Sequence, residues 1–551
     1  MKKLTSILFA MLLSTLSCWA YDFEYEGICY DMDYANGTAK VAPYSNVSAE
    51  NAAYYTGDIV IPDSARRLGK FYKVTFISQS AFSGCTGLTS VTIPNTVELI
   101  WTSAFSGCTA LTSVTIPESV TFIGDFAFQN CSALTTLTIG KGVNQMENKV
   151  FADCPSLTTV NFNVENYTRV NSANQTWFEN SPFTTLVIGD SVKVIPENLA
   201  TGNTSLSSLT IGKSVTTIGG YAFYGCSALT SVKIPDSVTT IADRAFGKCT
   251  SLDSLTIGRS VTSLDPSAFQ VCNAITSLTY NAMICPGAKT ISNLWFTGNG
   301  FTSLVIGDSV KSIPDYLAYK QIHLKSVVIP NSVTSIGEMA FAYCDSLTTV
   351  TLGDSIVTIG DHAFHFCTRL SSLTLPSTVV SIGKWAFYSC EGIPSIVIPD
   401  SVTRIGDSSF AFCEAATSLT IGSGVKTIGS GAFNGCEALR KVFCKVKEPI
   451  GIDNVTFQWL PYSSVTLYVP IGSGAKYAAT DYWNKFGTIE EIPFAAKGDV
   501  NCDEAIDVSD VTTLINKILG TTTVHNVLCD INDDEAIDVT DITTLIKMIA
   551  E

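Results

Sequence analysis

Apolar and polar positions repeat with a period of 23 residues along most of the chain. The stretch LTSVTIPNTVELIWTSAFSGCTA begins at Leu88, LTSVTIPESVTFIGDFAFQNCSA at Leu111, and LTTLTIGKGVNQMENKVFADCPS at Leu134. Further units begin at Leu157, Phe183, Leu206, Leu229, Leu252, Ile275, Phe301, Leu324, Leu347, Leu370, Ile393, Ala416 and Leu439. That gives 16 units, and those starting at residues 157, 275 and 439 are 26 residues long.

One unit shows why this pattern predicts a solenoid. Leu88, Val91 and Ile93 alternate with polar residues, as in a strand with one buried face, and Pro94 ends that strand because it cannot donate to a ladder. Two further inward-facing rows follow, at Val97 and Ile100 and at Phe105 and Cys108. No unit can bury these rows alone, so we expect the units to stack into one continuous core.

The consensus SVTIPxSVTxIGxxAFxxC resembles the BspA-type (Treponema-type) leucine-rich repeat of bacterial surface proteins, over about residues 57–490. The resemblance implies a leucine-rich-repeat solenoid with a parallel β-sheet on the concave face and a short helical, 3-10 or irregular convex side. It also implies a secreted or surface-displayed array that binds extracellular proteins.

The outward-facing strand positions are the first candidates for ligand contact. They are mostly short and neutral, as at Thr115 and Thr256, and could accept a protein or a glycan, or form a sheet surface without a ligand. Trp177 and Trp295, in the long units, are candidates because aromatic residues dominate binding hot spots. Alternatively, these two rings fill the core where the coil lengthens.

The repeat boundaries give a domain organisation. The predicted segments are a signal peptide (1–20), an N-terminal extension (21–56), a capping repeat (57–87), the repeat array (88–464), a C-terminal cap (465–493), a linker (494–497) and a calcium-loop domain (498–551). Caps are expected because the open ends of a solenoid expose its core.

The first 20 residues, MKKLTSILFAMLLSTLSCWA, have a basic start, an apolar run and small residues before Tyr21, as in a secretory signal peptide. A lipoprotein anchored at Cys18 is the alternative. No other apolar run is long enough to span a membrane.

The net charge of −16 argues against nucleic acid as a partner. We therefore expect a secreted or surface-attached bacterial protein.

The chain has 18 cysteines, which in a secreted protein first suggests disulfides. Their spacing instead favours a column of buried free thiols, because twelve occupy the same position of the repeat. These are Cys85, Cys108, Cys131, Cys154, Cys226, Cys249, Cys272, Cys344, Cys367, Cys390, Cys413 and Cys436. Cys502 and Cys529, outside the array, could pair with each other.

No catalytic arrangement is evident in the array. His362 and His365, in DHAFHFC, could share a metal if they lay on a helix, but they occupy variable positions of the repeat consensus. No phosphate-binding loop and no Ser-His-Asp order is evident. We therefore predict a protein without catalytic residues.

The C-terminal segment contains two acidic loops that match the twelve-position calcium pattern. Oxygen ligands at this spacing suit a calcium-sized hard cation, and each loop precedes an apolar pattern typical of a helix. The predicted ligands are Asp499, Asn501, Asp503, the carbonyl of Ala505, Asp507 and Asp510, and Asp530, Asn532, Asp534, the carbonyl of Ala536, Asp538 and Asp541. The helical patterns are Val511, Leu514, Ile515, Ile518 and Leu519, and Ile542, Leu545, Ile546 and Ile549.

These loops end in Asp where an EF-hand has Glu, and no helix precedes the first one; in both respects residues 498–551 resemble a type I dockerin. The resemblance implies two calcium ions and a calcium-dependent cohesin partner. The positions that would contact the cohesin are Val508, Ser509, Ile515, Asn516, Val539, Thr540, Ile546 and Lys547. The basic pair that members often carry on the helix is absent. Glu504 and Glu535 replace the usual Gly, which could reduce calcium affinity, although the same sequence DEAID in both loops indicates a workable variant.

Together these features predict a non-catalytic scaffold or adhesion protein. The array binds a protein or glycan, and the dockerin attaches the array to a cohesin-bearing protein. The alternative is a component of a polysaccharide-degrading complex, with carbohydrate binding or glycoside hydrolase activity in residues 21–497. A third hypothesis is a stiff spacer without a ligand.

Overall fold

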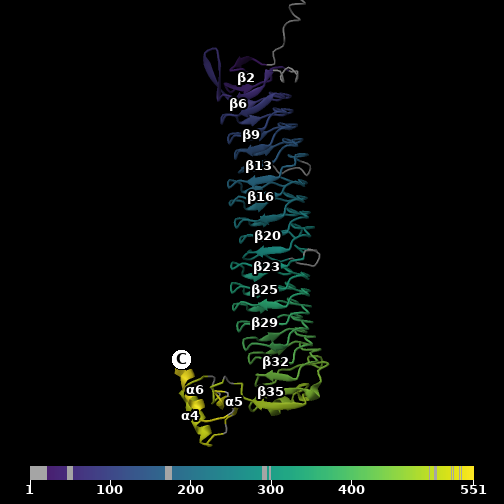
Figure 1. Cartoon of the computed structure of the whole chain (residues 1–551), viewed down its shortest axis with the longest axis vertical. Helices are drawn as coiled ribbons and strands as arrows, with labels where there is room; N and C mark the ends of the chain where they lie inside the picture. The colour runs from purple at the N-terminus through teal and green to yellow at the C-terminus, as the bar shows by residue number, and fades with distance from the viewer. Residues whose placement is uncertain are drawn as a thin grey trace, which may run out of the picture. The chain divides into compact units, whose positions relative to one another are not determined.

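The computed structural model describes residues 21–45, 54–167, 176–287, 294–296, 300–494, 497–501, 505–522, 524, 526–532, 534 and 536–550 (Figure 1). The chain divides into two compact units, residues 1–310 and 311–551. The predicted signal peptide and Cys18 lie outside the described residues. None of the described helices is both long and apolar enough to cross a membrane.

Most turns of the array begin with a short strand that pairs in parallel with a neighbour, whereas the turn from Leu370 has only an isolated bridge between Thr349 and Ser372. Strands β9 (Ser113–Ile116) and β11 (Thr136–Ile139) lie in register, and their alternate residues are buried. Strands β13 (Thr159–Phe162) and β14 (Thr185–Ile188) are also in register, although the unit that starts with β13 is 26 residues long. The additional residues of the long unit therefore lie outside the strand ladder.

The remaining strands of this first ladder follow the same pattern. In residues 1–310 they are β4 (Gly57–Val60), β7 (Leu88–Thr92), β16 (Ser208–Thr210), β18 (Ser231–Lys233), β20 (Ser254–Ile257), β22 (Ser277–Tyr280) and β23 (Ser303–Ile306). In residues 311–551 they are β25 (Ser326–Val328), β27 (Thr349–Thr351), β30 (Ser395–Val397), β32 (Ser418–Ile421), β34 (Lys441–Cys444), β35 (Thr466–Pro470) and β36 (Thr488–Ile492).

A second parallel ladder, built from two-residue strands, runs through the next segment of each turn. Its members are β8 (Leu99–Ile100), β10 (Phe122–Ile123), β12 (Gln145–Met146), β15 (Val194–Ile195), β17 (Thr217–Ile218), β19 (Thr240–Ile241) and β21 (Ser263–Leu264), then β24 (Ser312–Ile313), β26 (Ser335–Ile336), β28 (Thr358–Ile359), β29 (Ser381–Ile382), β31 (Arg404–Ile405) and β33 (Thr427–Ile428). The sequence predicted a row of inward side chains here, but not a sheet.

The third side of each turn, from the second strand to the next conserved Leu, consists of tight turns rather than helices. We call this surface the turn face. Neighbouring turns are joined there by backbone hydrogen bonds: the N–H of Phe105 donates to the carbonyl of Ala127, and that of Gly107 to Gln129, both at 2.7 Å. Of the forms expected for the convex side, the described residues adopt the irregular one.

Phenylalanine rings form stacked columns beneath the turn face. One column contains Phe82, Phe105, Phe128, Phe151 and Phe178; a second contains Phe223, Phe246, Phe269 and Phe296; in residues 311–551 a third contains Phe341, Phe364, Phe387, Phe410, Phe433 and Phe457. Ring centroids are 4.9–6.0 Å apart within a column. Ala200 and Ala318 occupy the ring position in turns that carry no such Phe.

The cysteine column lies beside these rings and is buried, as predicted. From Cys108 to Cys436, eleven cysteines each donate an S–H bond to the carbonyl oxygen of the residue 26 positions earlier, at 3.0–3.5 Å. These eleven side chains are therefore thiols that satisfy backbone acceptors, which confirms the expectation of free cysteines for them.

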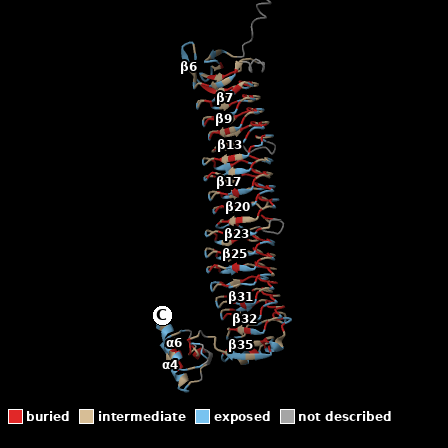
Figure 2. Ribbon diagram, viewed as in Figure 1, coloured by how far each residue is buried: buried red, intermediate tan, exposed pale blue. Residues whose placement is uncertain are grey.

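The N-terminal strands extend the second ladder. Strands β1 (Phe23–Tyr25), β2 (Ile28–Asp33) and β3 (Thr38–Val41) pair successively, and β3 joins β6 (Lys70–Ile77) in parallel. Strand β6 also pairs with β5 (Ser64–Arg67) in an antiparallel hairpin and with β8. Figure 2 shows that this hairpin is largely exposed, whereas buried residues run along the turns.

The C-terminal end of the array is irregular. It contains η2 (Tyr462–Ser464), α3 (Gly474–Ala479) and η3 (Trp483–Lys485) between the last strands. Tyr477 and Trp483 are buried there; the Tyr477 hydroxyl donates to the carbonyl of Val446 at 2.7 Å, and Trp483 Nε1 donates to that of Ile450 at 2.8 Å. These bonds tie residues 474–485 to the last turns.

Three helices follow: α4 (Val508–Ile518), α5 (Asn526–Cys529) and α6 (Val539–Ala550). They share a small core of Val500, Leu514, Cys529, Ile531 and Leu545. The predicted fold class is confirmed: a parallel-strand solenoid of about 17 turns precedes a small helical domain.

Candidate calcium loops and binding surfaces

The first acidic loop closes around Asp510, a carboxylate with no exposed surface. The backbone N–H of Asn501 donates to Asp510 Oδ1 at 3.0 Å, and the N–H of Asp507 donates to Oδ2 at 2.9 Å. Asp507 in turn caps α4 by accepting the N–H of Ser509 at 2.7 Å. One buried carboxylate therefore links the start of the loop to the start of the helix.

The second loop repeats this arrangement around Asp541, which is also fully buried. Asp541 Oδ1 accepts the N–H groups of Ile531 at 2.6 Å and Asn532 at 3.2 Å, and Oδ2 accepts that of Asp538 at 2.9 Å. The N–H of Asp534 donates to Oδ1 of Asp530 at 3.2 Å. Hydrogen bonds therefore link Asp534 with Asp530 and Asp538 with Asp541.

Hydrogen bonds keep the helix-capping carboxylates charged. The side-chain hydrogen bond from Ser509, followed by that from its backbone N–H, holds the pKa of Asp507 below its usual range. Thr540 lowers the pKa of Asp538 in the same way. Both groups are therefore anionic near neutral pH.

The residues present fit a hard cation. Asp499, Asp510 and Asp541 are buried, and no ion pair among the described residues involves Asp510 or Asp541. A buried carboxylate needs a compensating charge, and oxygen-only donors are those that calcium prefers. Within the described residues, no group of three or more His, Cys, Asp or Glu side chains could hold a metal ion. The ligands predicted from the sequence also include Asn side chains and backbone carbonyl oxygens. One predicted ligand, Asp503, lies outside the described residues.

Glu504, Glu535 and Cys502 also lie outside the described residues. Their predicted effects, a lower calcium affinity and a disulfide to Cys529, stay predictions, as do the individual ligand assignments.

The residues predicted to contact a cohesin all lie on the surface of the helical domain. Val508 and Val539, at the starts of α4 and α6, are 69% and 67% exposed. Leu519 and Met548 are also exposed on these helices and were not among the predicted contacts. The sequence pattern predicted Leu519 on the apolar side of the first helix together with Leu514. In the structure Leu514 is buried in the core, whereas Leu519 is exposed to solvent.

The strand face of the array carries a groove of about 1010 Å³ in residues 1–310. Thr115 lines it and is exposed, and the groove also includes the ion pair of Lys141 with Glu118, 2.7 Å apart. Thr256, further along the same ladder, is half-buried.

Trp177 and Trp295 are buried in the array. Trp177 packs edge-on against Tyr167 with centroids 5.2 Å apart, and Trp295 Nε1 donates to the carbonyl of Leu264 at 3.2 Å. Burial supports the core-filling role that was the alternative for these rings; ligand contact through them stays a prediction.

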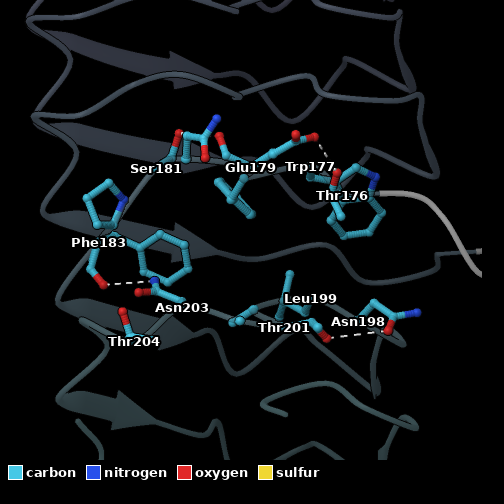
Figure 3. A pocket seen from close by; sticks show the side chains of 15 residues that line it. Thr176, Trp177, Glu179, Ser181, Phe183, Asn198, Leu199, Thr201, Asn203 and Thr204 are labelled. Atoms are coloured by element: carbon cyan, nitrogen blue, oxygen red, sulfur yellow. Dashed lines mark hydrogen bonds between the residues drawn. The ribbon is translucent and has the colours of Figure 1, made fainter. Parts of the chain in front are cut away.

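A cavity of about 390 Å³ lies next to Trp177, where Ala200 interrupts the phenylalanine column. In Figure 3, side chains of residues 176–183 line one side of it and those of residues 198–204 line the other. The missing ring at Ala200 explains the space.

The two histidines of DHAFHFC lie in a turn and not on a helix. Their ring centroids are 4.9 Å apart, and burial lowers the pKa of both, that of His365 to about 4.

Models of known protein families match both the repeat array and the C-terminal domain. A family model described as the BspA type leucine rich repeat region matches residues 75–202, 200–323 and 312–440, more than half of the chain, and a dockerin type I domain model matches residues 497–550. The search of curated proteins gave no match.

Several solved structures are similar. A leucine-rich repeat protein from Bacteroides ovatus shares 24% identity, with 79% of this chain and 99% of that chain covered and a TM-score of 0.38. A leucine rich cell surface protein from Faecalibacterium prausnitzii shares 25%, with 77% and 94% covered and a TM-score of 0.29. The leucine rich repeat protein of T. pallidum shares 29%, with 30% and 68% covered and a TM-score of 0.24.

The repeated turns, the two loop-and-helix units and the family matches agree: the chain belongs to the BspA-type leucine-rich repeat family and ends in a type I dockerin domain.

Proposed function

We propose that this protein is an extracellular, non-catalytic scaffold whose dockerin docks onto a cohesin when calcium is bound, while the strand face of its array holds a protein or glycan. Leucine-rich repeats and dockerins are non-catalytic interaction domains, and both are typical of extracellular or surface proteins. The observation that carries the proposal is the pair of buried loop carboxylates, Asp510 and Asp541, each joined to the start of a surface helix.

Two calcium ions would be held by the loop oxygens predicted from the sequence. When bound, calcium supplies the positive charge that these carboxylates need. Asp510 and Asp541 would then fix the directions of α4 and α6, because each already bonds to the N-cap residue of its helix. Loading the loops would therefore orient the apolar residues Val508, Ile515, Val539 and Ile546 toward the partner.

The test is a pulldown of extracellular proteins with the whole mature chain, in excess calcium and in chelator. We expect a cohesin-bearing protein to be captured only with calcium, and the double variant Asp510→Asn with Asp541→Asn to capture at least about tenfold less. Asp345→Asn, at an exposed array turn that does not line the groove, is the matched control and should leave capture unchanged. Equal capture with and without chelator would refute the calcium-dependent role.

The two related helices allow a second test of the same surface. Because α4 and α6 expose equivalent residues, Ile515→Glu or Ile546→Glu alone should reduce cohesin capture only slightly, since the other helix remains. The double variant should abolish capture. Complete loss in one single variant would show that only that helix contacts the partner.

The alternative is a polysaccharide-degrading component with hydrolase activity in residues 21–497. Release of sugar from plant or host glycans by the purified protein would favour it over a purely binding role.

A further inference from the structure

The imidazole of His365 lies between three successive turns of the turn face. The residue follows strand β28, and the next turn carries β29, which is labelled in Figure 1. Among the described residues, five aromatic rings lie within 6.0 Å of it, centroid to centroid: Tyr343 in the preceding turn, His362 and Phe366 in its own turn, and Trp385 and Tyr388 in the next turn. Only 7% of the residue is exposed, so these rings exclude most water from it.

Backbone hydrogen bonds join the same three turns at this point. The N–H of Tyr343 donates to the carbonyl of His365 at 2.7 Å, which links the preceding turn to this one. The N–H of His362 donates to the carbonyl of Lys384, also at 2.7 Å, which links this turn to the next. A change in the packing of the His365 ring therefore acts on the turns on both sides of it.

The surroundings of His365 suit the neutral imidazole. The ring forms a hydrogen bond with the backbone of Trp385, whereas its Nδ1 atom is buried and has no hydrogen-bond partner within the described residues. A neutral imidazole has a single N–H group, and the bond to Trp385 uses it, so Nδ1 is the nitrogen without a proton. A second proton would place both a charge and an unsatisfied donor in a buried position, and each of these costs free energy.

The charged groups around these turns do not compensate for a charge on His365. They are the carboxylates of Glu338 and Asp361, the ion pair of Lys384 with Asp407 at 2.8 Å, and the ammonium group of Lys320, which lies over the ring of Tyr343. The two carboxylates act on His362, which is half-buried, and the imidazole of His362 itself opposes a charge on His365. The faces of neighbouring rings attract a cation, but they replace neither its hydration nor the acceptor that Nδ1 lacks.

These surroundings give the closed turn a defined dependence on pH. Burial, followed by repulsion from His362, lowers the pKa of His365 to about 4, whereas an exposed imidazole has a pKa of about 6.5. An open turn, in which the ring is hydrated, therefore takes up a proton more readily than the closed turn. The stability that the neutral ring contributes is complete above about pH 6.5 and is lost as the pH falls toward about 4.

We propose that His365 is an acid-sensitive latch of the turn face, which releases its turn from the two neighbouring turns when the imidazole takes up a proton. The opening is local to residues 338–391, because the buried column of Phe341, Phe364 and Phe387 beneath the turn face holds the interior of the same turns together. The latch goes beyond the proposed function, since it requires neither calcium nor a ligand on the strand face. It makes the exposure of the turn face depend on the acidity of the surroundings.

The test is hydrogen–deuterium exchange of the whole chain at about pH 7 and about pH 4.5, with rates corrected for the pH dependence of the chemical exchange step. We expect amides of residues 338–391 to exchange at least about tenfold faster at the lower pH, and to regain protection on return to pH 7. His365→Tyr and His365→Ala should retain their protection at about pH 4.5, because neither side chain takes up a proton there. Both residues fit the fold, since Tyr388 and Ala342 occupy the same repeat position in the adjacent turns.

His323→Gln is the matched control, because His323 is an exposed histidine of the same array and should leave the acid response of residues 338–391 unchanged. Circular dichroism and the melting temperature at neutral pH show whether each variant is folded. The proposal is overturned if residues 338–391 of the unmodified chain stay protected at about pH 4.5, or if both His365 variants lose protection as the unmodified chain does. Loss of protection to the same extent along the whole array would also overturn it, because the opening would then not depend on His365.

Discussion

A thiol recurs at one position of twelve turns, and its chemistry follows from burial. The S–H groups donate to backbone carbonyls of the preceding turn, so each contributes to stacking as well as to packing. Burial raises the pKa of Cys226 and Cys344 to about 12. The thiols of Cys226 and Cys344 are therefore protonated and poor nucleophiles under physiological conditions.

This shift predicts alkaline sensitivity. An unfolded cysteine ionises near pH 8.5, so above that pH the unfolded chain loses protons that the folded chain retains, and stability falls as pH rises toward about 12. We expect the melting temperature in reductant to be constant between about pH 6.5 and 8 and to drop by several degrees by about pH 10.5. It should recover on return to neutral pH; a constant value throughout would contradict buried, protonated thiols.

A thiol reagent provides a direct check on the same feature. The eleven thiols from Cys108 to Cys436 should react with dithionitrobenzoate only after denaturation, and rapid reaction in the native protein would show that they are accessible.

At the scale of one turn, glycine sets how closely the coils approach. A Cβ on Gly383 would lie 2.5 Å from the backbone carbon of Gly360 and 2.6 Å from the nitrogen of Asp361 in the preceding turn. These neighbours are backbone atoms and cannot rotate away. The close approach of these two turns therefore requires glycine at position 383.

Gly383→Ala should destabilise the array by about 1–3 kcal/mol, because the two turns must separate. Gly451→Ala is the control, since a Cβ there meets nothing within 4 Å. The melting temperatures of both variants test this prediction. If the two substitutions lower the melting temperature equally, the turns are not in close contact at Gly383.

At the scale of the whole chain, the helical domain has a core of its own, formed by residues 500–549. We expect calorimetry to show a transition for this domain separate from that of the array. A ligand that binds only the folded form raises stability with its concentration, so excess calcium should raise the domain's transition relative to chelator and leave the array's unchanged. Parallel shifts of both transitions would show that calcium acts on the array as well.

The sequence predicted the features that depend on spacing along the chain. A period of 23 with Leu, Val, Ile, Phe and Cys at fixed positions determines the inward rows, and the same loop spacing found twice indicates the dockerin. The second sheet was missed because strands such as Leu99–Ile100 are too short to show alternation. The stacking of His362 on Trp385 was missed because both positions are variable within the consensus and become neighbours only when turns stack.

The interruptions in the phenylalanine columns have an evolutionary consequence. Ala200 and Ala318 are separated by the same length of sequence as Trp177 and Trp295, and as Asn163 and Asn281. That length is a whole number of repeat units, so a segment of this size can be copied or deleted by recombination while every strand keeps its register. The gene can therefore lengthen or shorten its product in steps of several coils in a single event, without a poorly packed intermediate.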